Sequence, residues 1–237
     1  MAIHYKVFIS EIIMSEYINI FNVILKRDLI LAFRDKTDFV NSLIFFIIVI
    51  TLFPLTFGTK STIVNEIIPG MIWISALLAT CLSLETIFRS DFEDGSIEQL
   101  TLSRYPLTLL VSAKIFAHWI TFGMPLIIIS LLMGILLSLS NEIIMALFIT
   151  LILGTPILSL LGSVMVALTI GLRGGMLLNL LILPLSMPVL IFSTVAIQNA
   201  ALNQSIIAET YFLAGILVLA ITLAPLATAA ALRIRLS

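Results

Sequence analysis

The segment "IIPGMIWISALLATCLSLETIFRSDFEDGSIEQL" (residues 67–100) joins two kinds of sequence that rarely adjoin in a soluble domain. Its first part, residues 67–88, is apolar and long enough to cross a bilayer, because about 20 residues of helix span the hydrocarbon core. Its second part is crowded with charged side chains: Arg89, Asp91, Glu93, Asp94 and Glu98. The segment therefore predicts a membrane-spanning helix that leads into a short polar region outside the lipid.

The rest of the chain repeats the apolar part of this pattern. Of 237 residues, 61% are hydrophobic and only 11% are charged, whereas a soluble domain carries roughly a quarter charged residues. We predict six spans, at about residues 40–57, 67–88, 109–139, 143–172, 176–197 and 211–232. The runs are continuously apolar, which favours helices over the alternating strands of a barrel. The expected fold class is an all-α polytopic membrane protein.

The basic residues predict how the chain is oriented. Six spans place both termini on one side of the membrane, together with the loops after the second and fourth spans. That side carries Lys6, Lys26, Arg27, Arg34, Lys36, Arg89, Arg104, Lys114, Arg173, Arg233 and Arg235, and the other side carries Lys60 alone. Because cytoplasmic loops are enriched in lysine and arginine, we expect both termini to be cytoplasmic.

Residues 1–38 form a separate N-terminal segment in this interpretation, and residues 39–237 form the six-helix transmembrane domain. The stretch "EYINIFNVILKRDLILAFRDK" (16–36) reads as an amphipathic helix. Apolar residues such as Ile20 and Ile24 share one face, although Asp28 falls among them. The pattern predicts a helix lying at the membrane surface. A plain membrane anchor and a functional connecting helix both remain open.

Residues 89–108 are the largest polar region between two spans, and we predict a short helix within them that runs through Gln99. Gly95 breaks the chain, Ser96 is a candidate N-cap, and Pro106 limits how far a helix can continue. Glu85 and Arg89 are spaced for an i, i+4 ion pair at the end of the second span. Such a segment can transmit force if a partner grips it, and a solvated acidic loop is the simpler alternative.

Signals for catalysis, metals and nucleic acids are mostly absent. The tetrapeptide "GTKS" (58–61) lacks the earlier glycine of a P-loop, and "GLRGGM" (171–176) follows no strand. One cysteine, Cys81, excludes a thiolate cluster, and a net charge of −1 argues against a nucleic-acid partner. We therefore expect a non-catalytic subunit; any ATP that drives it must be bound by another chain.

Several polar or special residues lie inside the predicted spans. His118 is interpreted as a hydrogen-bonded structural histidine in preference to a metal or haem ligand. Pro184 and Pro188 make the fifth span a candidate for a broken helix. Small residues allow helices to approach closely in the fourth span: Gly154, Ser159, Gly162 and Ser163.

Six stretches together resemble a known family: "LAFRDK", "NSLIFFIIVITLFPLTFG", residues 67–100, "AKIFAHWITFGMPLIII", "LILPLSMPVLIFS" and "TAAALRI". They look like the CcmB family, a membrane component of the haem exporter in bacterial cytochrome c maturation. The resemblance runs from about residue 25 to 234, and residues 1–13 look like an extension, so either Met1 or Met14 could be the initiator.

The resemblance implies a six-helix permease of the type-2 ABC exporter fold in the bacterial inner membrane. Such permeases pair as two copies, each docked on an ATPase subunit, here CcmA. They assemble with CcmC and CcmD, which handle haem for the periplasmic chaperone CcmE. ATP hydrolysis would drive release of haem-loaded CcmE, haem export, or both, so haem is a candidate cargo and no cofactor is expected to bind this chain directly.

By the same resemblance, "DFEDGSIEQL" matches the coupling helix that docks into the ATPase. We expect Glu93, Asp94, Gly95, Glu98 and Gln99 to make that contact, with Arg89 orienting it. A type-2 ABC permease for a polysaccharide, lipid or drug is an alternative. A secondary transporter or intramembrane enzyme is a second one; these usually hold several ionisable groups in the membrane, where here only His118 qualifies, with Glu85 near a span end.

Overall fold

The structure is a computed structural model that describes residues 2–34, 36–57, 62–171 and 176–236. These residues form helices and short connections, with no strand among them. The elements are α1 (Ala2–Arg34), α2 (Thr37–Phe57), α3 (Thr62–Leu84), α4 (Thr86–Glu93), α5 (Ser96–Thr101), α6 (Leu107–His118), the π-helix η1 (Trp119–Gly123), α7 (Met124–Leu136), α8 (Asn141–Thr169), α9 (Met176–Ala201) and α10 (Ile207–Leu236). The predicted all-α class is confirmed.

The helices account for the predicted membrane spans. Five helical stretches are long and apolar enough to cross a membrane: 67–93, 107–136, 141–169, 180–201 and 207–235. A sixth is reached if Met14–Arg34 and Thr37–Phe53, which meet at 69°, count as one bent span. The predicted first span lies in α2, and the predicted third span is built from α6, η1 and α7.

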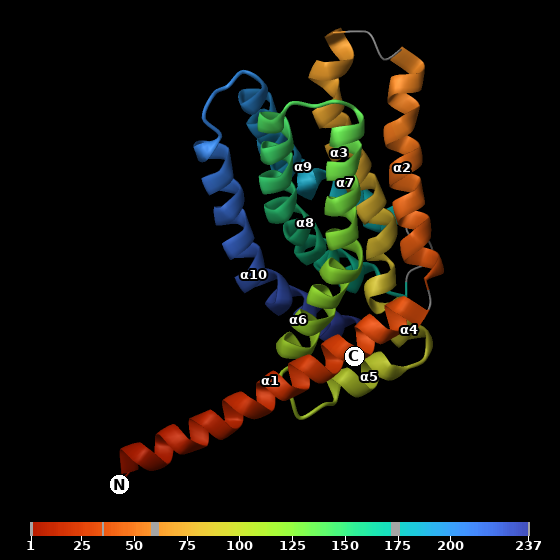
Figure 1. Cartoon of the computed structure of the whole chain (residues 1–237). Coiled ribbons are helices and arrows are strands. Elements are labelled where there is room, and N and C mark those ends of the chain that lie inside the picture. Colours follow the sequence, from red (N-terminus) through yellow and green to blue (C-terminus); the bar gives the residue numbers. More distant parts are fainter. Residues whose placement is uncertain (1, 35, 58–61, 172–175, 237) are drawn as a thin grey trace.

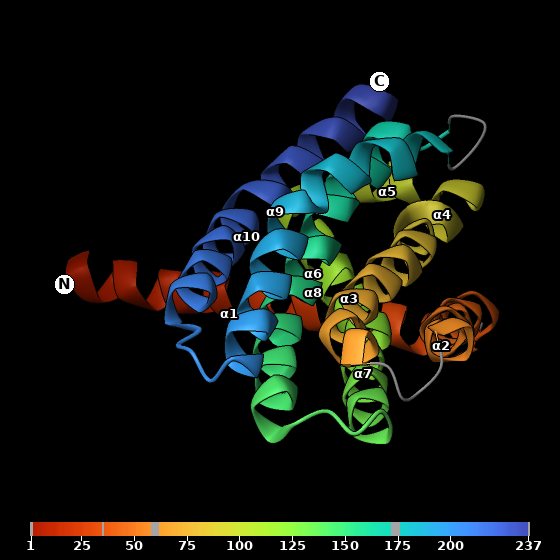
Figure 2. The ribbon, with the colours of Figure 1, turned by 90° about the horizontal axis from the view of Figure 1, so that it is seen from above.

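The long helices stand side by side as a bundle, and α1 crosses one end of it (Figures 1 and 2). α4, α5 and both termini lie at that same end, which we call the α1 end, whereas the α7–α8 and α9–α10 connections lie at the opposite end (Figure 1). This arrangement agrees with the predicted alternation of the spans. All of "GTKS", including Lys60, and residues 172–175 of "GLRGGM", including Arg173, lie outside the described residues.

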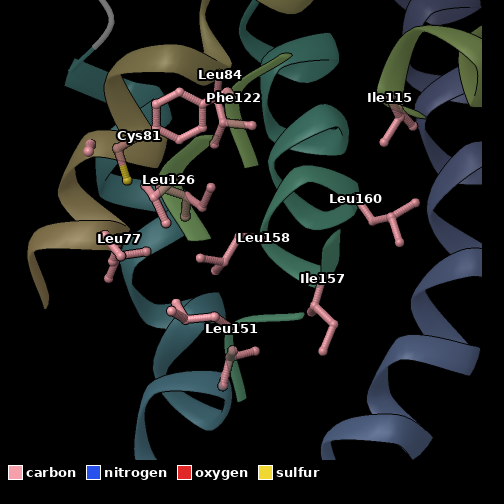
Figure 3. Close-up of a cluster of buried hydrophobic side chains, with 14 of the residues drawn as sticks. Leu77, Cys81, Leu84, Ile115, Phe122, Leu126, Leu151, Ile157, Leu158 and Leu160 are labelled. Carbon is pink, nitrogen blue, oxygen red and sulfur yellow. The ribbon is translucent and has the colours of Figure 1, made fainter. Parts of the chain in front are cut away.

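α8 is the central helix, and it packs against α3, α9 and α10. Its glycines allow this: a Cβ at Gly154 would lie 2.3 Å from Cη2 of the buried Trp73, and one at Gly162 would lie 2.4 Å from Leu84 Cδ1. Figure 3 shows leucines of α3 and α8 meeting Phe122 and Leu126 in the apolar core. The predicted use of small residues for close helix contact is confirmed.

The prolines of the fifth span predicted a break in α9, but the irregular backbone lies elsewhere, at η1. α9 continues through Pro184 and Pro188, so the predicted broken helix is wrong. Membrane helices tolerate proline where local adjustments satisfy the freed backbone groups, and here both prolines lie inside the continuous helix α9. The backbone changes instead at η1, directly before Pro125, which has no N–H to donate to the preceding turn.

Candidate functional site

The polar region after the second span folds as two short helices joined by a tight turn. α4 ends at Glu93, and Gly95 adopts a left-handed conformation with φ of 74°, which glycine enters without a Cβ penalty. α5 then starts at Ser96, whose backbone N–H donates to Asp94 Oδ1 at 2.9 Å. The predicted short helix is present, but Gly95, not Ser96, is its N-cap, and it continues to Thr101.

The residues predicted to contact an ATPase lie on the outside of this unit. The side chains of Arg89, Glu93, Asp94, Glu98 and Gln99 are exposed, and Gly95 is half-buried between them. Hydrogen bonds from Ser96, first from its side chain and then from its backbone, lower the pKa of Asp94 below its usual range. The five exposed residues therefore give this end of the molecule a mainly acidic surface, while their contact with a partner stays a prediction.

Arg89 pairs with a different carboxylate from the predicted one. Its Nε lies 3.0 Å from Glu93 Oε1, and both side chains are more than half exposed. Glu85 is the N-cap of α4 and forms no ion pair with Arg89, whose guanidinium is directed to Glu93. The predicted Glu85–Arg89 pair is therefore wrong.

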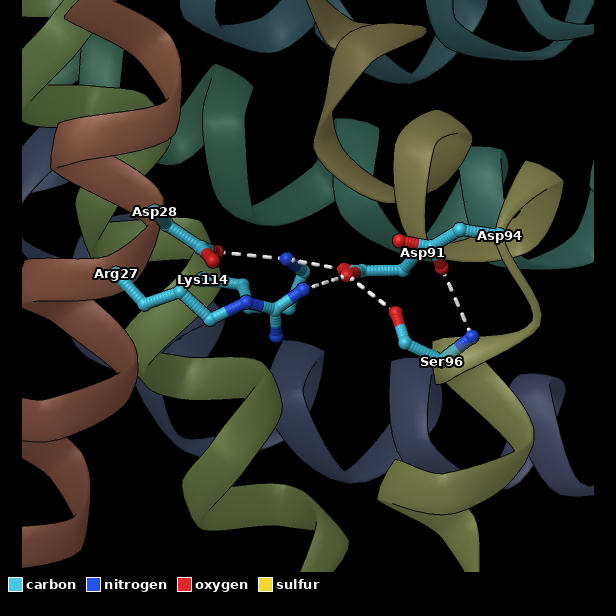
Figure 4. A network of polar contacts seen from close by, with 6 residues as sticks. All are labelled: Arg27, Asp28, Asp91, Asp94, Ser96 and Lys114. Atoms are coloured by element: carbon cyan, nitrogen blue, oxygen red, sulfur yellow. Dashed lines mark hydrogen bonds and ion pairs between the residues drawn. The ribbon is translucent and has the colours of Figure 1, made fainter. Parts of the chain in front are cut away.

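Beneath the acidic surface, Asp91 is fully buried and holds four elements together (Figure 4). Its Oδ1 pairs with Arg27 of α1 and accepts a hydrogen bond from Ser96 Oγ at 2.8 Å. Its Oδ2 lies 2.5 Å from Lys114 Nζ of α6. Lys114 Nζ also lies 2.6 Å from Asp28 Oδ2 of α1. We call Arg27, Asp28, Asp91 and Lys114 the charge network.

The charge network balances two acidic and two basic side chains, of which Asp91 and Lys114 are the most deeply buried. Lys114 is 4% exposed and the Asp91 side chain 1%. Burying a charge is costly unless a partner compensates it, so each member depends on the others. The network therefore fixes the α4–α5 unit to both α1 and α6.

Sequence reasoning missed this network. Lys114 lies within the spanning stretch 107–136 and Asp91 within 67–93, so the statement that only His118 is ionisable inside the spans was wrong. One signal was available, because Asp28 stood out on the apolar face of the N-terminal helix. That face packs against α6, and Asp28 meets Lys114 there.

His118 lies one turn further into the bundle and is hydrogen-bonded, as predicted. Its Nε2 lies 3.0 Å from Ser83 Oγ of α3, and its Nδ1 lies 3.1 Å from Ser159 Oγ of α8. The ring also stacks on Phe122. Both nitrogens are thus engaged by serine hydroxyls.

The fold and this site define an all-α, multi-pass membrane protein with a charged helical unit anchored at one end of its bundle. Residues 19–235 match the model of the family described as CcmB protein, and the chain belongs to that family.

Three similar proteins from bacteria share one name. The chain is 49% identical over 217 residues to "Heme exporter protein B" of Pseudomonas aeruginosa, which covers 91% of this chain and 97% of the relative. It is 49% identical over 218 residues to the protein of that name in Haemophilus influenzae, covering 92% and 99%. The same name from Escherichia coli K12 is 46% identical over 212 residues, covering 89% and 96%.

Proposed function

We propose that this chain is the membrane permease subunit of a haem-delivery complex in c-type cytochrome maturation. The observation that carries the proposal is the family match over residues 19–235, together with relatives of nearly equal length named Heme exporter protein B. The multi-pass helical fold fits a membrane component of such a complex. The family match favours this cargo over a polysaccharide, lipid or drug.

The proposal includes a separate, CcmA-like ATPase that docks on α4 and α5 at the α1 end, in the manner of a type-2 ABC exporter. Glu93, Asp94, Gly95, Glu98 and Gln99 would make the contact and Arg89 would orient it. Support comes from their exposure and from the anchoring beneath them. Asp91 links the α4–α5 unit to Lys114 of α6 and Arg27 of α1. A displacement of α4 by the ATPase would therefore move both helices.

The remaining expectations follow from family membership. The permease would act as a homodimer in the bacterial inner membrane, with both termini cytoplasmic and with CcmC-like and CcmD-like proteins beside it. Haem would be the cargo, passed through this subunit or released on the chaperone CcmE by energy from ATP. In the second case the permease needs no haem ligand of its own, which suits a histidine whose two nitrogens are already bonded.

The test is a mild-detergent pull-down of the tagged protein from its native membranes, read by mass spectrometry. We expect an ATPase subunit and haem-handling membrane proteins to be recovered. The double variant Glu98→Ala, Gln99→Ala should lose the ATPase but keep the membrane partners. A loss of about 2 kcal/mol at such a contact lowers affinity roughly thirtyfold.

The matched control is Glu142→Ala, which removes an exposed carboxylate from the start of α8 at the opposite end of the bundle. It should leave ATPase recovery and mature cytochrome c unchanged. Normal recovery with the double variant would refute docking on α5. Recovery of an ATPase with no haem-handling protein would refute the haem-delivery assignment.

A further inference from the structure

Two interruptions of the α-helical backbone lie side by side in the bundle. In the spanning stretch 67–93, α3 and α4 meet at Glu85. In the next span, α6 passes into α7 through the π-helix η1. Ser83, close to the first interruption, has its Oγ 3.0 Å from Nε2 of His118, which directly precedes the second. The two interruptions are therefore at the same depth in the bundle.

The α3–α4 junction carries hydroxyl side chains that bond to the helix backbone. Thr86 Oγ1 donates to the Ser83 carbonyl at 2.7 Å, and Ser83 Oγ donates to the Thr80 carbonyl at 2.9 Å. Bonds of this kind to the preceding turn often bend helices. Glu85 itself keeps right-handed helical angles, with φ of −56° and ψ of −26°. The junction is therefore a bend in helical backbone, which small changes of these angles can open or close.

The second interruption is fastened to the central helix. The Met124 N–H donates to the carbonyl of Trp119, five residues earlier, and Pro125 has no N–H for the carbonyl of Thr121. The Trp119 indole Nε1 donates to Thr155 Oγ1 of α8 at 3.0 Å. Long helices bend at π-turns, which are frequent at functional sites. η1 is thus a bending point whose position is held by α8.

On the α1 side of both interruptions, the charge network joins the elements into one body. Asp91 and Lys114 connect α4 and α6 with α1, and the Ser96 Oγ bond to Asp91 adds α5 (Figure 4). We call α1, α4, α5 and α6 the base unit. Separating buried charges from their partners is costly, so these four elements move together, with α6 sliding along α10, on which it also packs.

A cavity of about 680 Å³ lies between the charge network and the two interruptions. Lys114 and Ala117 of the base unit line it, and so do Ser83, Thr121 and Phe122 at or beside the interruptions. Protein interiors are close-packed and leave few voids larger than a water molecule. A space of this size therefore gives the base unit room to tilt.

We propose that the α3–α4 junction and η1 are paired hinges about which the base unit tilts, opening and closing this cavity. The tilt keeps the charge network intact and changes the angle between α6 and α7. As a path for movement driven by an ATPase, the tilt rests on the proposed function. The hinges themselves belong to this chain and are tested without a partner.

The test measures distances between pairs of spin labels by pulsed electron paramagnetic resonance, on the full chain in lipid nanodiscs. In a Cys81→Ala background, exposed Leu102→Cys and Leu136→Cys lie across the hinges, whereas exposed Leu102→Cys and Ile30→Cys both lie in the base unit. Because switching transitions shift helices by about 1–5 Å, we expect the distances across the hinges to be spread about twice as widely as those inside the base unit. Equal widths would overturn the proposal.

A proline variant tests η1. Pro125→Ala supplies an N–H for the Thr121 carbonyl and favours a continuous α-helix, so it should narrow the distribution across the hinges to the width seen inside the base unit. The matched control is Pro188→Ala, because α9 is already a continuous helix there, and it should leave the distribution unchanged. An equal effect of the two variants would show that η1 is not a hinge.

A second variant tests the cavity. Ala32→Phe adds a ring to the lining and should also narrow the distribution across the hinges, whereas Val23→Phe on the same helix, exposed and outside the cavity, should not. A width that survives Ala32→Phe would overturn the link between cavity and tilt. A narrow distribution in the parent chain together with normal ATPase recovery would refute the hinges alone, and a wide one without any ATPase would refute the proposed docking alone.

Discussion

The ammonium of Lys114 meets two carboxylates in a site that excludes water, with Nζ 2.5 Å from Asp91 Oδ2 and 2.6 Å from Asp28 Oδ2. An exposed ion pair contributes little, because water and salt screen it. Here the partners cannot turn to water, so removing one charge leaves another without compensation. The exposed Arg104–Glu16 pair, 3.2 Å apart at the same end of the bundle, provides a direct comparison.

We predict that Lys114→Met lowers the free energy of unfolding by about 3 kcal/mol or more, because Asp91 and Asp28 lose their shared cation. The measurement is thermal unfolding of the purified protein in detergent. Arg104→Gln is the control and should cost less than about 1 kcal/mol. Adding Asp91→Asn to Lys114→Met should recover part of the loss, since the remaining Arg27 and Asp28 again balance. Equal stability of Lys114→Met and Arg104→Gln would show that the network carries no such energy.

The roles of some site residues could be predicted from the sequence, and those of others could not. The exposed set around Gly95 was predictable, because charge density and a glycine break are local properties. The network was not, because Arg27, Asp91 and Lys114 are 64 and 23 positions apart and meet only when α1 folds against α6. A helical wheel marks Asp28 as misplaced but does not name its partner.

At the scale of helices, the contact of α8 with α3 depends on Gly154, which has no side chain. Trp73 of α3 is fully buried over Gly154, and its Nε1 donates to Thr150 Oγ1 of α8 at 3.2 Å. The indole is thus held both by van der Waals contact and by a hydrogen bond. Without water in the bilayer core, such close packing is a main source of helix association.

We predict that Gly154→Ala destabilises the protein by about 1–3 kcal/mol, the usual cost of overpacking, because the new Cβ would lie 2.3 Å from Trp73 Cη2. Thermal unfolding followed by tryptophan fluorescence measures the loss. Gly215→Ala on α10 is the matched control, since no side chain or neighbouring backbone lies within 4 Å of its Cβ position. It should be neutral or stabilising by up to about 1 kcal/mol through helix propensity. A similar response of the two variants would contradict the packing argument.

Long elements were predictable because a continuous apolar run has few alternatives to a helix in lipid. The deviations were harder. Pro184 and Pro188 suggested a break in α9, yet the helix accommodates both, while a single Pro125 accompanies the π-helix η1. A proline removes one backbone N–H donor, and this loss can be read from the sequence. Whether the backbone bends there depends on how the surrounding helices pack.

For the whole molecule, the main prediction from sequence is the side of the membrane that each end faces. α1 and α4, which carry Arg27, Arg34 and Arg89, lie at the α1 end, as do the α5–α6 connection with Arg104 and the C-terminal end of α10 with Arg233 and Arg235 (Figure 1). The bundle thereby supports the geometric part of the positive-inside argument. Which end is cytoplasmic still rests on the charge distribution, since the bundle alone is compatible with either insertion.

We predict that Gln204→Cys, in the exposed α9–α10 connection, reacts with a membrane-impermeant maleimide in intact spheroplasts. Leu102→Cys, which replaces an 86% exposed residue between α5 and α6, should react only after lysis. Both variants are made in a Cys81→Ala background, and the parent chain is itself a control because Cys81 is buried. The reverse labelling pattern would place α4 and α5 outside the cytoplasm, where ATP is absent. That result would refute coupling to a cytoplasmic ATPase at this end while leaving family membership intact.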